Sequence, residues 1–214
     1  MRTAPAIAFA AGLLMALSGV ARAADDGPYL GLGLGSHFLS DAPLAGGAVS
    51  GEARFENGWA TIGSVGLALN RNWRAEVEVG YRRNNVASVS GGSATGEVNA
   101  WSGLGNVLYD VDLGSSWTPY VGVGAGALRY RASGLRTSGG SLTDSDVVFA
   151  YQGIIGVSYA VTPNSRFFLD YRYLRADDPS VRDAAGNSLR TEYHSNTLMF
   201  GFRFTLAQPT PEAR

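Results

Sequence analysis

The residues best suited to catalysis in this chain of 214 residues stand near its end, in a stretch that reads EYHSN and runs from Glu192 to Asn196. A serine nucleophile needs a base such as histidine within hydrogen-bond reach. His194 and Ser195 are adjacent, and adjacent side chains of an extended strand point to opposite faces. Glu192 and His194 would share a face, but no nucleophile stands beside them. The stretch therefore does not predict a catalytic site.

Metal ligands are scarce. The chain has two histidines, the other being His37, and no cysteine. Distant single histidines without thiolates do not make a metal site, and a chain without cysteine has no disulfide framework. His37 falls near the end of a strand predicted below, where we expect an exposed side chain. We expect no metal and no other cofactor, and a net charge of −1 gives no indication of nucleic-acid binding.

Two glycine-rich runs could suggest a phosphate-binding loop: YLGLGLGSHF at 29–38 and YVGVGAGAL at 120–128. The dinucleotide-binding pattern is G-x-G-x-x-G at a turn from strand to helix. Here the glycines recur at every second residue, which is the period of a strand whose side chains alternate between two faces. The runs therefore predict strands with one apolar face and one face that lacks side chains.

The N-terminal segment MRTAPAIAFAAGLLMALSGVARA, residues 1–23, has a basic start, an apolar stretch and a small-residue site ARA. These features are typical of a cleaved secretory signal peptide, and the apolar stretch is short for the alternative, an anchor helix. No later apolar run reaches the ~18–20 residues of a membrane helix. We expect a signal peptide over 1–23, one domain over 24–206 and a short proline-containing tail over 207–214.

Segments with a period of two recur along the whole domain. Each is close to or longer than the ~9–11 residues with which a tilted strand crosses a bilayer. The predicted strands are 28–39, 58–69, 73–83, 97–111, 118–131, 147–161, 166–175 and 193–206.

The predicted connections alternate between short and long. Short ones fall at 70–72, 112–116 and 162–165, and long polar ones at 40–57, 84–96, 132–146 and 176–192. Up-and-down strands joined in this way place all short turns at one end, as in outer-membrane barrels with short periplasmic turns and long external loops. The pattern predicts an all-β protein, an eight-stranded antiparallel up-and-down transmembrane β-barrel.

One face of the predicted strands is apolar, and aromatic residues gather at both of its ends. Two interfacial girdles are predicted, because amphipathic rings favour the boundary between headgroups and acyl chains. The girdle beside the short turns comprises Trp73, Tyr109, Trp117, Tyr159, Phe167 and Phe204, and the girdle beside the long loops comprises Phe38, Trp59, Tyr81, Trp101, Tyr151 and Tyr173. The alternative is a soluble lipocalin-like barrel, whose apolar face would point inward.

The opposite face carries charged residues on some strands and glycines on others. An eight-stranded barrel is only just wide enough to be filled by side chains. We expect the glycines of 28–39 and 118–131 to make room for arginines across the interior. We also expect three acidic and three basic residues to form an internal charge network: Glu76, Glu78, Asp170, Arg82, Arg172 and Arg203.

Several segments together resemble the small outer-membrane barrels of the OmpA transmembrane-domain, OmpX and opacity-protein kind. They are NWRAEVEVGYR (72–82), NVLYDVDLGSSWTPYVGVGAG (106–126), FAYQGIIGVSYAVTPN (149–164), FFLDYRYL (167–174) and the aromatic last strand. The resemblance covers residues 27–206 and implies export to the outer membrane of a Gram-negative cell. It also implies insertion by the barrel-assembly machinery, for which LMFGFRF (198–204) would be the signal. In OmpA-type members a hinge and a peptidoglycan-binding domain follow the barrel; AQPTPEAR (207–214) looks like the start of such a hinge only, so peptidoglycan anchoring is not predicted.

Three functions remain open at this point. The first is a structural and surface-interaction role, with contacts to outer-membrane lipids, lipopolysaccharide or a loop ligand; Arg129, Arg131 and Arg136 near the external rim could pair with lipid phosphates. The second is a small gated porin-like channel. The third is a lipid A-modifying enzyme, because one such eight-stranded barrel uses His and Ser two residues apart; here His194 and Ser195 are adjacent.

Overall fold

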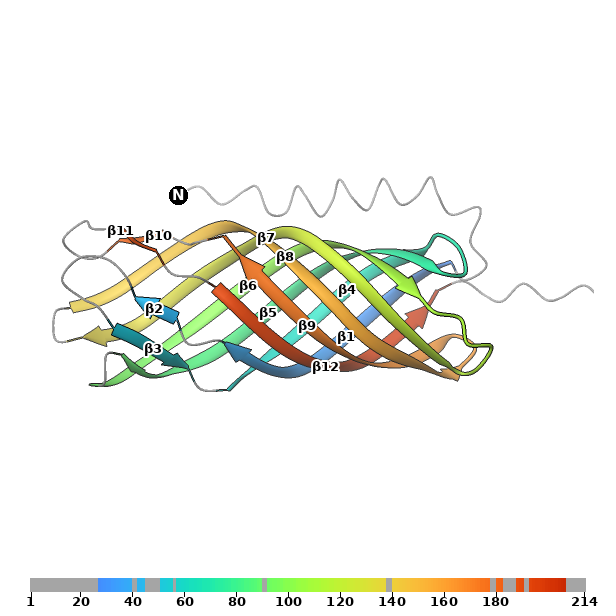
Figure 1. Cartoon of the computed structure of the whole chain (residues 1–214), viewed down its shortest axis with the longest axis horizontal. Helices are drawn as coiled ribbons and strands as arrows, with labels where there is room; N and C mark the ends of the chain where they lie inside the picture. Colours follow the sequence, from blue (N-terminus) through green and yellow to red (C-terminus); the bar gives the residue numbers. More distant parts are fainter. Residues whose placement is uncertain are drawn as a thin grey trace, which may run out of the picture.

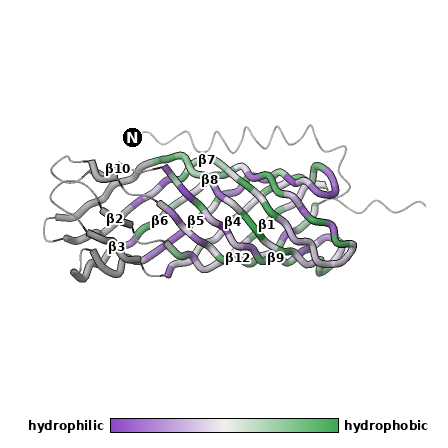
Figure 2. Tube along the Cα trace, in the orientation of Figure 1, coloured by the Kyte–Doolittle hydropathy of each residue, from purple (hydrophilic) through white to green (hydrophobic). Residues whose placement is uncertain are grey.

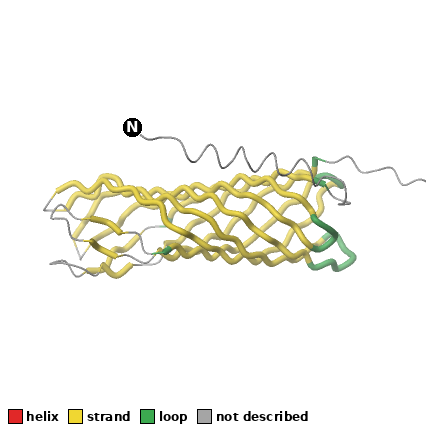
Figure 3. The backbone as a smooth tube through the Cα atoms, turned by 90° about the horizontal axis from the view of Figure 1, so that it is seen from above, coloured by secondary structure: helices red, strands yellow, loops and turns green. Residues whose placement is uncertain are grey.

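The computed structural model describes residues 27–39, 42–44, 51–55, 57–89, 92–137, 140–177, 180–182, 188–190 and 193–206. The predicted signal peptide (1–23) and tail (207–214) lie outside the described residues. Strands joined by turns make up the described chain (Figure 3). No helix in it is long and apolar enough to cross a membrane.

Eight long strands form the wall of the molecule (Figure 1). They are β1 (Pro28–Leu39), β4 (Gly58–Ala68), β5 (Trp73–Val89), β6 (Gly92–Asp110), β7 (Trp117–Thr137), β8 (Gly140–Thr162), β9 (Ser165–Ala176) and β12 (Tyr193–Thr205). Each pairs antiparallel with its neighbour in the chain, and β1 pairs with β12, so that the sheet closes on itself. The predicted eight-stranded antiparallel barrel is confirmed.

The strands are staggered around the barrel. A path of directly paired residues that starts at Ala68 of β4 passes through every other strand and returns to β4 at Gly58, ten residues away. Such a stagger tilts the strands and, with the number of strands, sets the width of the barrel. The path passes through Arg74, Leu108, Gly122, Ile154, Arg172, Thr197 and His37 in turn.

Short turns close one end of the barrel, where the first and last wall strands also begin and end (Figure 1). In the turn after β4 the side chain of Asn70 accepts hydrogen bonds from the backbone N–H groups of Asn72 and Trp73, both at 2.9 Å. In the turn after β6 Asp112 accepts from the N–H of Gly114, whose φ of 61° is a conformation that glycine adopts without strain. Asn, Asp and Gly are the residue types that such turns favour.

At the opposite end the strands run further than predicted. The predicted loops 84–96 and 132–146 are wrong, because paired strand continues to Val89 and Gly92 in one hairpin and to Thr137 and Gly140 in the other. The hydropathy pattern stops earlier, because a strand needs an alternation of apolar and polar residues only where one of its faces meets lipid. The predicted loop 40–57 contains β2 (Ala42–Leu44) and β3 (Gly51–Phe55), and 176–192 contains β10 (Ser180–Arg182) and β11 (Ser188–Arg190).

Side chains alternate between an apolar outer surface and the barrel interior. Figure 2 shows hydrophobic and hydrophilic residues following one another along the strands. Leu32 and Val123 are 63% and 68% exposed, whereas Arg82 and Glu78 are 1% and 0% exposed. A lipocalin-like barrel would need the reverse arrangement, so that alternative does not fit.

The interior also holds apolar residues, which the sequence reading did not include. One cluster lies toward the short turns and comprises Ala60, Ile62, Leu108, Tyr120, Ile154, Phe168 and Met199. A second lies toward the long loops on β6 to β9 and comprises Ala100, Leu104, Leu128, Ala150, Leu174 and Ala176. Charged residues of the interior are thus packed among apolar side chains.

The inward glycines make room for neighbours in the wall. A Cβ at Gly33 would lie 3.0 Å from Ile62 and 3.1 Å from Met199, and a Cβ at Gly124 would overlap the side chain of Asn106. We expected arginines in the space that these glycines leave. That expectation is wrong, because the nearest side chains are those of Ile62, Met199 and Asn106. Directly paired residues on adjacent strands have Cβ atoms only ~4.5–5.5 Å apart, so an adjacent strand fills the space first.

Candidate functional site

The centre of the interior is crossed by an ion-pair cluster. Arg172 of β9 donates from Nη1 to Oε2 of Glu78 on β5, and from Nε and Nη2 to the two carboxylate oxygens of Asp170 at 2.8 and 3.0 Å. Tyr120 of β7 donates its hydroxyl to Asp170 at 2.9 Å. Glu78, Asp170 and Arg172 are at most 3% exposed, so water screens these charges little.

Amide side chains extend this cluster. Asn106 of β6 donates its amide to Glu76 and to Glu78, each at 3.1 Å, and its Oδ1 accepts a hydrogen bond from Gln152 at 2.8 Å. Asn106 therefore links two carboxylates that lie on the same face of β5. The negative charges of these two carboxylates repel each other. A hydrogen-bond donor that both carboxylates share reduces the electrostatic cost of this repulsion.

A second cluster lies nearer the short turns. Arg74 donates from Nε and Nη2 to the two carboxylate oxygens of Asp110 at 2.7 and 2.9 Å, and from Nη1 to the hydroxyl of Tyr29 at 3.0 Å. Tyr29 in turn donates to Glu76 at 2.9 Å. Two parallel bonds of this kind between guanidinium and carboxylate are among the strongest polar contacts in proteins.

Arg203 of β12 lies over aromatic rings. Its guanidinium carbon is 5.2 Å from the ring centre of Tyr29, 5.7 Å from that of Tyr120 and 5.9 Å from that of Phe168. A guanidinium within about 6 Å of a ring face is attracted by the negative face of the ring. The predicted network placed Arg203 among carboxylates; the contacts that the structure gives it are aromatic.

Toward the long loops, Arg82 donates from Nη1 to Ser102 at 2.7 Å. His37 is fully buried, with its Nδ1 2.9 Å from Oγ1 of Thr197. The expectation of an exposed His37 at the rim is therefore wrong. His37 shares the face of Gly35, and that face points into the barrel, so the strand period decides its position.

The six predicted network residues are all buried in the interior. The predicted network did not include six residues that bond its members or one another: Tyr29, Arg74, Asn106, Asp110, Tyr120 and Gln152. The signal was present, because Asp110 follows Asn106 by four residues on one strand face, and Tyr29 and Tyr120 share the inward faces of glycine-rich strands.

The histidine and serine near the C-terminal end do not meet. Ser195 is fully buried inside the barrel, whereas His194 lies partly exposed with its ring centre 6.2 Å from that of Tyr173. A base and a nucleophile need hydrogen-bond contact. Glu192, the third residue considered, lies outside the described residues.

Outward aromatic side chains form two rows. Beside the short turns, Trp73 packs on Tyr109 and Trp117 on Tyr159, with ring centres 5.0 and 4.7 Å apart. Beside the long loops, Tyr81 lies 5.4 Å from Trp59 and 4.8 Å from Trp101. The other predicted girdle residues also lie on the outer face, at least partly exposed: Phe38, Tyr151, Phe167, Tyr173 and Phe204.

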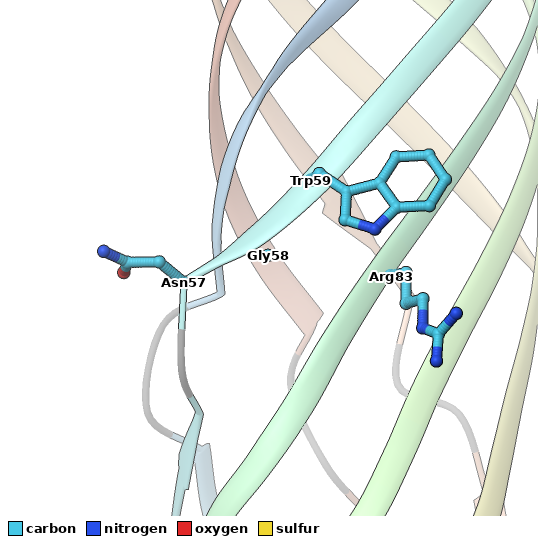
Figure 4. A pocket seen from close by; sticks show the side chains of 4 residues that line it. All are labelled: Asn57, Gly58, Trp59 and Arg83. Carbon is cyan, nitrogen blue, oxygen red and sulfur yellow. The ribbon is translucent and has the colours of Figure 1, made fainter.

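A shallow cavity of about 190 Å³ opens beside the second row and is lined by Asn57, Gly58, Trp59 and Arg83 (Figure 4). Arg83 is already paired with Glu97, at 2.6 Å between Nη2 and Oε2. Glu97 also accepts from Asn99 at 2.7 Å. The charge of Arg83 is therefore balanced within the wall.

Comparisons with known proteins agree with this architecture. Residues 7–204 match the model of the family described as outer membrane protein beta-barrel domain. An outer membrane protein of Gluconacetobacter diazotrophicus is 30% identical over 243 aligned residues, which cover 95% of this chain and 64% of the relative. The chain thus spans less than two thirds of the length of that relative.

Three solved structures share the fold at low sequence identity. OprG of Pseudomonas aeruginosa is 14% identical, with a TM-score of 0.65 over 83% of this chain and 95% of OprG. The outer membrane protein AlkL is 16% identical, with a TM-score of 0.55 over 89% and 95% of the two chains. Neisserial surface protein A is 21% identical, with a TM-score of 0.53 over 84% and 99%.

Proposed function

The chain belongs to the outer membrane protein beta-barrel domain family, and we propose that it acts as a closed barrel with a structural and surface-contact role. Its location is the outer membrane. The interior of the barrel decides whether solutes can pass, and its outer surface decides what the barrel contacts.

The observation that carries the proposal is the filled interior. Arg172 reaches Glu78 from the opposite wall, and apolar clusters lie toward both ends of this pair. Eight strands leave an interior just wide enough for side chains, whereas open aqueous channels belong to barrels of ~16–18 strands. The packing therefore supports a barrel that does not conduct.

The outer surface supports contact with lipid. Large apolar residues such as Leu32 and Val123 face outward between the two aromatic rows. On β12, the outward residues Leu198, Phe200, Phe202 and Phe204 are 46–49% exposed. We infer that this last strand is the part that the assembly machinery recognises, and that the long connections are available for a surface ligand.

The test compares conduction, lipid chemistry and membrane integrity. Purified wild-type protein in planar lipid bilayers is expected to give no stable single-channel steps, and its expression is expected to leave the mass of lipid A unchanged. A strain that lacks the protein is expected to admit more of a large apolar antibiotic, with recovery on complementation. Stable steps would transfer the assignment to a channel, and an altered lipid A mass would transfer it to an enzyme.

A small gated channel is the second candidate, and one observation favours it. Arg172 bonds both Glu78 and Asp170, so it can leave Glu78 while its charge stays paired. Under this candidate, Glu78→Gln should raise the frequency of openings in planar bilayers. Under the closed barrel, Glu78→Gln and wild type should both remain silent.

A further inference from the structure

Two arginines on the outer face of β7 stand apart from the paired charges of the wall. Arg129 and Arg131 are both exposed and lie two residues apart on the same face of the strand. At about 3.3 Å per residue their Cα atoms are ~6.6 Å apart, so both guanidiniums can reach one anionic group. In the part of the chain that the structure describes, no carboxylate pairs with either of them, whereas Arg83 on the same rim pairs with Glu97.

The surroundings place this arginine pair at the edge of the aromatic row beside the long loops. Arg129 lies directly opposite Trp101 on β6, and Arg131 lies opposite Asn99, one step further from the short turns. Trp101 is 55% exposed and packs against Tyr81, whose hydroxyl donates to Asn99 at 3.0 Å. Tryptophan and tyrosine concentrate at the level of lipid headgroups. The two guanidiniums therefore stand at the headgroup level.

The surface on the membrane side of the pair is flat. Below Arg129, Ala127 and Ala125 of β7 pair with Gly103 and Gly105 of β6. A Cβ at Gly103 would find no atom within 4 Å. Val79 and Phe149 flank this strip and are 51% and 54% exposed. An acyl chain attached to a headgroup at Arg129 would have an apolar surface to lie against.

We propose that Arg129 and Arg131 bind a phosphate group of a lipid in the outer leaflet of the outer membrane. This inference rests on the proposed surface-contact role and names its partner. Guanidinium groups match phosphate oxygens with paired hydrogen bonds, and among the described residues no carboxylate balances the charge of this pair. Short turns face the periplasm in barrels of this kind, so the long-loop end with its arginines faces the outer leaflet. The adjoining apolar strip favours a phospholipid-like ligand over free phosphate.

The experiment measures binding of bis-phosphorylated, hexa-acylated lipid A to the purified full chain in detergent micelles, by native mass spectrometry. Contacts between charges at exposed sites are modest, so R129Q/R131Q, which removes two of them, is expected to weaken binding by about tenfold. Arg71→Gln, which removes one exposed charge in the turn at the other end, is the control for charge loss away from the pair and should leave binding unchanged. Lipid A without its phosphates should bind wild type as weakly as bis-phosphorylated lipid A binds the double variant.

Other outcomes overturn the inference. Equal binding by wild type and R129Q/R131Q, or equal binding of lipid A with and without phosphates, removes the phosphate contact. An equal loss in Arg71→Gln indicates general attraction between charges, and full displacement of lipid A by millimolar inorganic phosphate indicates an anion site without lipid preference. Each preparation is also checked for the gel shift between unboiled and boiled samples, so an unfolded variant is recognised. Conduction by wild type would overturn the closed barrel while leaving this binding result intact.

Discussion

Arg172 on β9 donates to Glu78 on β5, and these two strands lie opposite each other, four strands apart in either direction around the barrel. The contact therefore spans the full width of the interior. Because Arg172 also holds Asp170, one guanidinium compensates two buried carboxylates. The stability of the barrel should depend strongly on this single side chain.

Replacing Arg172 by methionine tests that dependence. The variant leaves Glu78 and Asp170 buried without their cation, and breaking a buried pair in this way costs about 3–5 kcal/mol. The measurement is urea unfolding of the refolded protein in lipid vesicles. Arg71→Met in an exposed turn is the control, with an expected change within about 0.5 kcal/mol.

The double variant E78Q/R172M should lose less than the sum of the two single variants, because each single change removes the same contact. Strict additivity of the three unfolding free energies would show that the pair contributes no coupling. In that case the interior would be held by its apolar clusters instead.

Two glycines on opposite faces of the wall give a second prediction. A Cβ at Gly35 would overlap the backbone carbonyl oxygen of Leu198, which cannot move aside as a side chain can, whereas a Cβ at Gly103 would meet no atom within 4 Å. Gly35→Ala is therefore expected to destabilise by about 1–3 kcal/mol, the usual cost of overpacking, and Gly103→Ala to be neutral or stabilising. The fraction of protein that migrates as the folded band after refolding is the readout. A larger loss of stability in Gly103→Ala than in Gly35→Ala would contradict this packing.

The pair of Arg74 and Asp110 gives a third prediction, which compares a shielded with an exposed ion pair. A double-mutant cycle with R74Q and D110N should give a coupling energy of about 1.5–3 kcal/mol, because both hydrogen bonds are charge-assisted and Arg74 is 4% exposed. The same cycle on Arg83 and Glu97, whose side chains are 45% and 33% exposed, should give about 0.2–1 kcal/mol. Equal coupling energies for the two cycles would count against the role of burial.

R74Q alone should also cost more than D110N alone. Arg74 bonds Tyr29 as well as Asp110, and Tyr29 in turn bonds Glu76. Arg74 Nη1 also lies 4.0 Å from Oε2 of Glu76. Loss of the guanidinium therefore disturbs three partners, while loss of the carboxylate charge of Asp110 disturbs one. The comparison uses the single variants that the cycle already requires.

The period of two predicted most of the wall, and the first strand matches its predicted bounds, 28–39. The strand ends beyond the membrane could not be predicted in the same way. In the hairpin that joins Val89 to Gly92, backbone pairing continues, although its residue types do not alternate between apolar and polar. Burial of one strand face selects apolar residues, but backbone hydrogen bonds form with almost any residue type and so cannot be predicted from hydropathy.

The sequence predicted which residues lie in the interior better than it predicted which of them contact one another. Alternation alone places Glu78 and Arg172 inside, but they are 94 residues apart in the sequence. The number of strands determines which strands face each other across the interior. The stagger determines which residues of those strands lie at the same height along the barrel axis. Hydropathy does not give the stagger, so the pairing of Arg172 with two carboxylates, and the aromatic contacts of Arg203, were not available from sequence.

The tryptophans offer a direct test of how the barrel sits in the membrane. The chain has four, and all lie in the two aromatic rows: Trp73 and Trp117 beside the short turns, Trp59 and Trp101 beside the long loops. Four variants that each retain one tryptophan, with phenylalanine at the other three positions, separate their signals. In vesicles, lipids brominated near the headgroup should quench all four more strongly than lipids brominated at the chain end, because interfacial rings sit near the headgroups.

A water-soluble quencher added outside the vesicles then separates the two rows. Where the barrel inserts in one direction, one row should be quenched and the other protected, and Trp59 should always behave as Trp101 does. A split within a row, with Trp59 accessible and Trp101 protected, would contradict the tilt and stagger of the strands. Strongest quenching by chain-end bromine at any of the four positions would mean that the apolar band is displaced from the region between the two rows. Equal responses of Trp59 and Trp101 are the expected result, because both rings pack against Tyr81 in one cluster.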